Sequence, residues 1–302
     1  MKLENIFRDL KIEEGMFLRN LSIYPVSDGG SSGFSVRTLD EGLSKGDVRV
    51  KELSSSRVEE IEVINDSPDR LFFLDGEEII GALQDRITNT AALVESSSTV
   101  RVPVTCIEQG RWEGKKEFRE SFLSSHPRLR AILCKGVTES LRRRKSFKGP
   151  QKEVWKEVTR KLNSFKISSR TSTLHDVYKG LRDEVERYIE EAEGLRGFNG
   201  FIAYAGDKLL GFEYFYDKSM FEKFIPKLLR GYALDGLEIR KPTPLKSLAR
   251  IKNFIEDIKK IETEDYPSIA LGKESRFIKG NLTGRIFLFE EKPLQASIFT
   301  LS

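Results

Sequence analysis

Two short stretches of the chain place charged and amide side chains directly beside apolar runs with the pattern of β-strands, at residues 76–86 and 102–112. Burying an ionised group costs several kcal/mol unless the group is paired or serves a ligand. We therefore expect the two stretches to form the walls of one site. The candidate site residues are Glu77, Gln84, Arg86, Glu108, Arg111 and Trp112.

The two carboxylates are the candidate catalytic groups. Glu108 follows an almost wholly apolar strand, so burial could raise its pKa and let it act as a general base. Glu77 and Glu108 could instead hold a hard divalent cation such as Mg²⁺ together, although no cofactor is specified by the sequence. Arg86 and Arg111 carry forked donors that match a phosphate, and an amide could orient a substrate.

Each of these residues could instead have a purely structural role. Arg86 could pair with Glu77 or Asp85 to close a hairpin, and Arg111 could neutralise Glu108. Trp112 could be a plug at a domain interface instead of a ligand contact, as most buried aromatic side chains serve packing.

The sequence gives little support to a nucleophilic cysteine, a histidine-rich metal site or a Ser/His/Asp triad. Cys106 has apolar neighbours and no nearby histidine, which favours an inert core thiol. His126 and His175 are the only histidines, so a His-rich metal site or a Ser/His/Asp triad is not expected. His175 is expected in the first turn of a helix.

The segment 128–170 is strongly basic, with 14 lysines and arginines against three glutamates, whereas the whole chain has a net charge of +4. The run Arg142, Arg143, Arg144 and Lys145 is predicted to be an exposed basic loop. A positive surface of this kind can attract nucleic acid or another anionic partner. The alternative is a solvated loop without a partner.

The hydrophobic patterning predicts an α+β fold with a mainly β first part. Short alternating runs separated by turn residues indicate an N-terminal antiparallel β-sandwich-like half, residues 1–115, which carries both motifs. Asp75 and Gly76 are predicted to form a two-residue hairpin turn between neighbouring strands. The second domain, residues 116–302, is predicted to be an α+β half packed on the first, carrying the basic loop.

Helical periodicity appears after Trp112. Apolar residues share one face over residues 154–165 and again over 174–189. Strands are expected at 200–205 and 208–216, a helix at 219–234 that is interrupted at Pro226, and a further helix at 245–261. The chain is expected to end in strands.

No apolar run approaches the length of a membrane span, and no secretory signal is visible, so a cytoplasmic protein is expected. The two cysteines lie in no CxxC pair, which fits a reducing compartment.

Taken together, the motifs resemble the uncharacterised prokaryotic domain family named for its association with ADP-ribosylglycohydrolases and Rhodanese-phosphatases. The resemblance covers most of the chain from about residue 15, and its most specific part is the Glu-x-Gly-Arg-Trp block after a Val-Pro-Val strand. Where members often carry a lysine before the glutamine, this chain has Leu83. The residues that carry the resemblance are Gly76, Glu77, Gly81, Gln84, Asp85, Arg86, Val102, Pro103, Val104, Cys106, Glu108, Gly110, Arg111, Trp112, Gln151 and Trp155.

The family name implies a link to ADP-ribose, NAD or RNA-end metabolism. One hypothesis is therefore that the protein binds, and processes, a small phosphate-bearing nucleotide-like ligand at the Glu/Arg/Gln site. The alternative is a non-catalytic module that binds nucleic acid or a protein through the basic segment 128–170. A third interpretation is that both motifs are structural.

Overall fold

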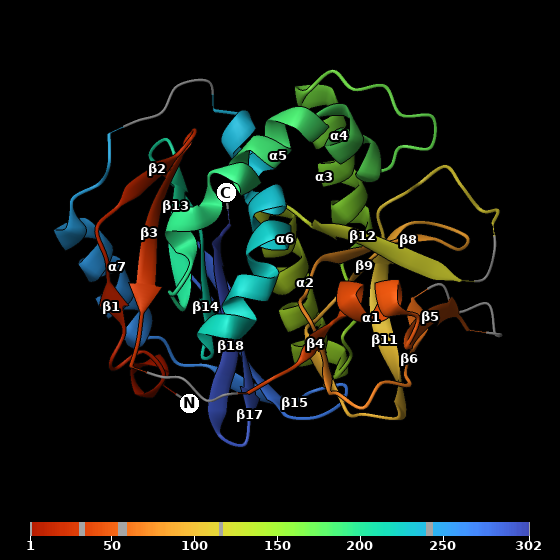
Figure 1. Ribbon diagram of the computed structural model, residues 1–302, viewed down its shortest axis with the longest axis horizontal. Coiled ribbons are helices and arrows are strands. Elements are labelled where there is room, and N and C mark those ends of the chain that lie inside the picture. Colours follow the sequence, from red (N-terminus) through yellow and green to blue (C-terminus); the bar gives the residue numbers. More distant parts are fainter. Residues whose placement is uncertain (1, 30–33, 54–58, 115–116, 240–243, 302) are drawn as a thin grey trace.

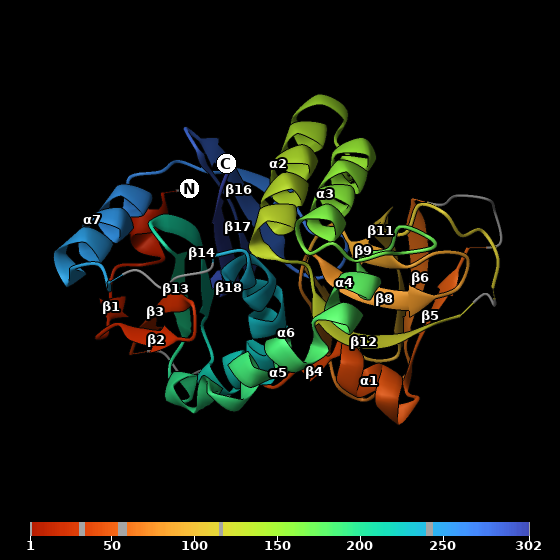
Figure 2. The same ribbon diagram turned by 90° about the horizontal axis from the view of Figure 1, so that it is seen from above.

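The computed structural model describes residues 2–29, 34–53, 59–114, 117–239 and 244–301. Within these ranges the chain forms three β-sheets and seven α-helices, arranged as Figures 1 and 2 show. The α+β class predicted from the sequence is confirmed.

The largest sheet has nine strands, in the order β1-β3-β13-β14-β18-β17-β16-β15, with β2 also paired to β3. One face packs on α7 (Leu248–Lys259) through Ile251, Ile255 and Ile258, and the other packs on α6 (Lys218–Leu237). Both faces are therefore covered. The strands are β1 Lys11–Ile12, β2 Met16–Leu18, β3 Leu21–Ser27, β13 Gly200–Ala205, β14 Lys208–Phe215, β15 Glu264–Pro267, β16 Lys273–Lys279, β17 Leu282–Phe289 and β18 Lys292–Thr300.

A six-stranded sheet and a three-stranded sheet enclose a separate apolar core. The six-stranded sheet has the order β12-β8-β9-β11-β6-β5, and the smaller one has the order β10-β7-β4. Side chains from both sheets and from α1 (Leu39–Lys45) share one cluster of buried residues. The strands are β4 Arg37–Thr38, β5 Val48–Glu52, β6 Glu60–Asn65, β7 Leu71–Phe73, β8 Glu77–Gly81, β9 Arg86–Thr88, β10 Ala92–Val94, β11 Ser98–Cys106 and β12 Phe118–Ser124.

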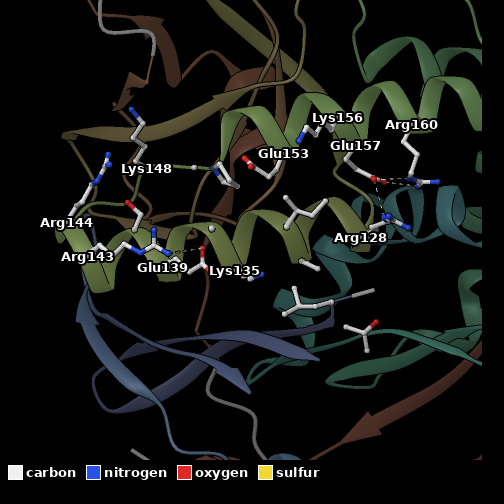
Figure 3. A pocket seen from close by; sticks show the side chains of 18 residues that line it. Arg128, Lys135, Glu139, Arg143, Arg144, Lys148, Glu153, Lys156, Glu157 and Arg160 are labelled. Atoms are coloured by element: carbon white, nitrogen blue, oxygen red, sulfur yellow. Dashed lines mark hydrogen bonds and ion pairs between the residues drawn. The ribbon is translucent and has the colours of Figure 1, made fainter. Parts of the chain in front are cut away.

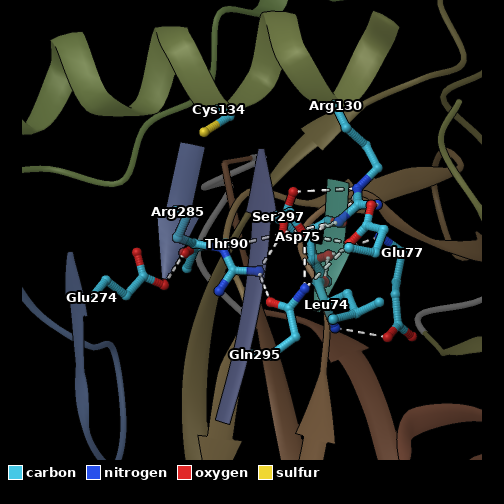
Figure 4. A network of polar contacts seen from close by, with 12 residues as sticks. Leu74, Asp75, Glu77, Thr90, Arg130, Cys134, Glu274, Arg285, Gln295 and Ser297 are labelled. Carbon is cyan, nitrogen blue, oxygen red and sulfur yellow. Dashed lines mark hydrogen bonds and ion pairs between the residues drawn. The ribbon is translucent and has the colours of Figure 1, made fainter. Parts of the chain in front are cut away.

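The predicted hairpin at Asp75 and Gly76 is wrong. β7 belongs to the three-stranded sheet and β8 to the six-stranded sheet, so the chain crosses between sheets at this point. Figure 4 shows why: Asp75 lies in a buried polar network, where its carboxylate pairs with Arg285 at 2.6 Å and Arg130 at 3.4 Å. Gly76 has a φ of +76° and lies so close to Arg130 that a Cβ there would come within 2.8 Å of its Cγ.

Two antiparallel helices follow the β12 strand and lie side by side (Figure 2). They are α2, Pro127–Arg144, and α3, Gln151–Ser164. The predicted basic loop is therefore wrong in part, because Arg142, Arg143 and Arg144 form the last turn of α2 and Lys145 caps it. Cations are favoured there because they complement the partial negative charge of a helix C-terminus.

The remaining helices differ from the sequence expectations in two places. Residues 174–189 form two short helices, α4 (His175–Gly180) and α5 (Arg182–Glu190), instead of one. α6 runs through Pro226 without interruption. Its apolar face, which includes Phe224 and Leu228, is almost completely buried, and we attribute its continuity to this packing, which can outweigh the cost of about 3 kcal/mol for an interior proline.

The sheets do not divide between the two halves at residue 115, since β1, β2 and β3 lie in the same sheet as β13 to β18. The division into folding units at that residue stays a prediction.

Candidate functional site

Glu77 stands at the start of β8 and is completely buried. Its carboxylate accepts a hydrogen bond from the Leu74 backbone N–H at 2.7 Å and pairs with Lys227 of α6, which also contacts Asp40 of α1 at 2.5 Å. Burial raises the pKa of Glu77. Burial alone would lower the pKa of Lys227, but the two carboxylates beside it raise that pKa overall. Glu77 is thus held by protein groups.

Arg86, on β9, is also completely buried, and its guanidinium pairs with Glu52 of β5 at 2.8 Å. The sequence suggested that Arg86 pairs with Glu77 or Asp85. In the structure its ion-pair partner is Glu52, on a strand more distant in the chain. Cys106, opposite Arg86 in the sheet, is a buried free thiol whose pKa is raised by burial, as expected for a core cysteine.

Four of the motif residues do come together, at the ends of β8 and β11. The Gln84 amide donates to the Glu108 carbonyl at 2.6 Å, and the Asp85 N–H donates to the Glu108 carboxylate at 3.0 Å. Arg111 pairs with Glu108 at 2.7 Å and with Asp85 at 3.0 Å. Despite burial, hydrogen bonds from Arg111 and the Asp85 N–H lower the pKa of Glu108, whereas burial raises that of Asp85.

The guanidinium of Arg111 is fully engaged. Besides the two carboxylates, it donates to the carbonyl oxygens of Gly81, Ala82 and Glu113 at 2.8–3.1 Å. All three guanidinium nitrogens therefore hydrogen-bond the protein. Binding a phosphate through Arg111 would require some of these bonds to be exchanged, so its predicted role as a phosphate clamp stays a prediction.

The partners of Glu77 and those of Glu108 form two separate sets, and no cluster of three metal-ligating side chains occurs among the described residues. Trp112 is 58% exposed, which is contrary to the interpretation as an interface plug. The predicted ligand-binding and catalytic roles of the six motif residues remain predictions.

Sequence reasoning missed a pair beside this cluster. Glu78, the neighbour of Glu77, points to the other face of β8, where its carboxylate lies 3.1 Å from His175 Nδ1 at the start of α4. Glu78 is buried, whereas the His175 side chain is 32% exposed. The bond to Glu78 raises the pKa of His175, and burial raises that of Glu78. The alternation of side chains along a strand was the available signal.

A groove of about 780 Å³ lies between α2 and α3 (Figure 3), within the segment that the sequence marked as basic. Its volume falls in the range of sites for small organic ligands. The lining residues are Arg128, Ala131, Ile132, Lys135, Gly136, Glu139, Ser140, Arg143, Arg144, Lys148, Gly149, Pro150, Glu153, Lys156, Glu157, Arg160, Thr300 and Leu301.

Small residues and one amide set the spacing of the two helices. Gly136 of α2 touches Pro150 so closely that a Cβ would lie 2.4 Å from the proline Cγ. Next to this contact, the Gln151 side chain exchanges two hydrogen bonds with the backbone of Cys106, at 2.9 and 2.8 Å, which fixes the start of α3 to β11. This explains the presence of Gln151 among the motif residues.

The two ends of the groove differ in charge balance. At one end, which we call the paired end, the buried Glu157 carboxylate contacts Arg128 at 3.1 Å, Arg160 at 2.7 Å and His126 at 2.9 Å. Despite its burial, these partners hold the pKa of Glu157 well below its usual range. Arg160 also pairs with Glu238 at 3.0 Å. The two arginines of this end are therefore paired with carboxylates of the protein.

The opposite end, which we call the open end, contains Arg143, Arg144 and Lys148. The Arg143 guanidinium has a long contact of 3.8 Å to the Glu139 carboxylate, and the Arg143 side chain is 75% exposed. Arg144 has no ion pair with any residue that the structure describes. Lys148 pairs with Glu59 at the surface. The open end thus retains uncompensated positive charge.

The comparison with known families decides the relationship of the chain. The family described as the ARG and Rhodanese-Phosphatase-superfamily-associated Protein domain, ARPP-1, matches residues 9–299. The chain belongs to this family. The ARPP-1 match confirms the resemblance inferred from the motifs and extends over both the motif cluster and the groove. No curated protein and no solved structure is significantly similar to the chain.

The ARPP-1 name describes an association with other proteins, and it specifies no ligand. Among the described residues, no helix combines the length and the apolar character needed to cross a membrane.

Proposed function

We propose that the protein binds a small phosphate-bearing, nucleotide-like ligand in the groove between α2 and α3. The observation that carries the proposal is the uncompensated positive charge at the open end of a groove large enough for such a ligand. Charge-assisted hydrogen bonds from arginine and lysine are the usual means of holding phosphate groups in proteins.

The groove combines this charge with some apolar surface. Ala131, Ile132 and Leu301 lie among the lining residues, so a planar base could pack on them while the phosphates contact the cations. Ten of the eighteen lining residues are charged, so the groove is more polar than a typical small-molecule site and suits a charged ligand. In the motif cluster around Glu108, by comparison, the Arg111 guanidinium is saturated by protein partners.

The proposal is tested by isothermal titration calorimetry with ADP, which supplies a base, a ribose and two phosphates. We expect saturable binding to the parent protein. Replacing Arg143→Gln and Arg144→Gln together removes the two arginines of the open end, so the affinity should fall at least about tenfold.

The matched control is Lys252→Gln, which removes an exposed lysine from α7, on the far side of the molecule in Figure 2. This variant should bind ADP as the parent does. An absence of saturable binding to the parent, or equal affinity in the double variant, would overturn the proposal.

A further inference from the structure

We infer that the groove takes a ligand whose negative charge is confined to one end, as in a nucleoside monophosphate or diphosphate, and that it does not take an extended polyanion such as a nucleic-acid strand. This inference rests on the proposed function and adds the class and the direction of the ligand. It assigns the phosphates to the open end and the uncharged part to the paired end.

The paired end offers little to an anion. Behind Glu157, the buried Lys161 of α3 pairs with Asp235 at 2.6 Å and with Glu238 at 3.1 Å. Arg128, Arg160 and Lys161 are therefore matched by three carboxylates, and Lys156, which precedes Glu157 on α3, is the lining cation here without an ion pair to a described residue. A phosphate entering this end would have to displace Glu157, which is only 3% exposed and has three partners.

The open end has the opposite balance of side-chain charge. The N-terminus of the 14-residue helix α3 lies at this end, where Gly149 and Pro150 line the groove, and the C-terminus of α2 lies beside it at Arg144. The partial positive and partial negative charges of these two helix ends oppose each other, so the side chains decide the balance. Arg143 and Arg144 therefore carry the site for a phosphate or pyrophosphate group.

The middle of the groove is suited to an uncharged ring. Ile132 and Leu301 are among the lining residues and supply apolar surface, and Glu153, in the middle, supplies a carboxylate that can accept hydrogen bonds from ribose hydroxyls. A second phosphate group in the middle would meet the carboxylates of Glu139 and Glu153 as well as the cations of Lys135 and Lys156. A nucleic-acid strand would place phosphates along the whole groove, including the end where the arginines are already paired.

The first test compares three probes by equilibrium binding at two salt concentrations: inorganic pyrophosphate, ADP and a single-stranded oligonucleotide of about 12 nucleotides. We expect ADP to bind at least about tenfold more tightly than pyrophosphate, because its base and ribose add contacts in the middle of the groove. The salt dependence of ADP binding should be shallow, because a small anion carries no condensed counterions to release, whereas oligonucleotide binding along the groove would depend steeply on salt.

The second test uses charge variants at the two ends. Arg143→Gln should weaken ADP binding about tenfold, whereas Arg160→Gln should change it by less than threefold. Glu157→Gln removes the carboxylate that neutralises the paired end, so it should create a second anion site and tighten binding of the oligonucleotide. Thermal melting of each variant shows whether it remains folded. Glu157→Gln is expected to bind the oligonucleotide more tightly, and a misfolded protein would not produce that result.

The outcomes separate the two proposals. If none of the probes binds, the proposed function fails as well. Two results would reject the one-ended ligand but leave the groove as a binding site for anions. The first is that ADP binds but Arg143→Gln and Arg160→Gln weaken its binding equally. The second is that the oligonucleotide binds more tightly than ADP, with a steep salt dependence. Unchanged oligonucleotide binding in folded Glu157→Gln would also contradict the inference.

Discussion

At the scale of single residues, Glu77 shows how a motif carboxylate can serve the fold. The sequence placed this glutamate beside an apolar strand, and the structure confirms that its side chain is buried. Its partner Lys227 lies 150 positions away, and Asp40 comes from a third segment. A single sequence contains no signal for such a distant pair, so the sequence identifies Glu77 as a candidate catalytic carboxylate without identifying its partners.

Removing Lys227 should therefore cost stability. Lys227→Met leaves two buried carboxylates without their cation, so we expect the free energy of unfolding in urea to fall by about 3–5 kcal/mol. Lys223→Met is the matched control on the same helix, because Lys223 pairs with Glu41 near the surface and should cost less than about 1 kcal/mol. Equal losses in the two variants would show that the buried pair is not essential.

The Glu78 and His175 pair predicts a specific pH dependence. Both pKa values are raised in the folded protein, so the pair's contribution to stability is fully present below the unfolded pKa values and is lost as pH rises through the folded ones. For His175 the loss begins above about pH 6.5, the ordinary histidine pKa. Glu78→Gln should lower the pKa of His175 toward that ordinary value.

Proton NMR can follow this change directly because the chain has only two histidines. His126 is the internal reference, since burial lowers its pKa and it lies in a different part of the fold. We expect His175 to titrate at higher pH than His126 in the parent. A His175 pKa that is the same in the parent and in Glu78→Gln would contradict the assigned contact.

At the scale of elements, helical periodicity was a better guide than turn and breaker residues, which wrongly predicted a hairpin at Asp75 and Gly76 and an interruption at Pro226. The apolar face of Val154, Val158 and Leu162 predicted α3, and these side chains are buried. The sequence analysis did not predict α1, although the chain carries a signal for its start, namely the capping box formed by Thr38 and Glu41. α2 was missed because a charge run was interpreted as a loop, although such cations are also favoured at a helix C-terminus.

The spacing of α2 and α3 depends on Gly136. Gly136→Ala would place a methyl group 2.4 Å from the Pro150 ring, which cannot rotate away, so the helices must separate. We expect a loss of about 1–3 kcal/mol in the free energy of unfolding, together with weaker ADP binding. Ser140→Ala on the same helix is the control and should change stability by less than about 0.5 kcal/mol. A stable Gly136→Ala variant with parental affinity would show that this contact does not set the groove.

At the scale of the whole molecule, a buried polar network joins parts of the chain that are far apart in sequence (Figure 4). Arg130 of α2 contacts Asp75, the Glu213 carboxylate of β14 and the Ser297 hydroxyl of β18, while Arg285 of β17 contacts Asp75 as well. α2 is thereby fixed to both β regions on one side and lines the groove on the other.

The sequence showed that the segment 128–170 is basic, but it did not show which of its cations face the groove. Arg130 and Lys161 belong to the basic segment, yet both are buried in ion pairs, and only part of the segment faces the groove. The sequence also predicted one site made of both motifs. In the structure Gln84, Glu108 and Arg111 meet, whereas Glu77 and Arg86 have other partners, because strand pairing and sheet assignment decide which side chains converge.

The most direct test of the central claim is a crystal structure of the protein with ADP. The account predicts the two phosphates between Arg143, Arg144 and Lys148, with the base on Ile132 toward the paired end. Density for ADP beside Glu108 and Arg111, with the groove between α2 and α3 empty, would contradict it.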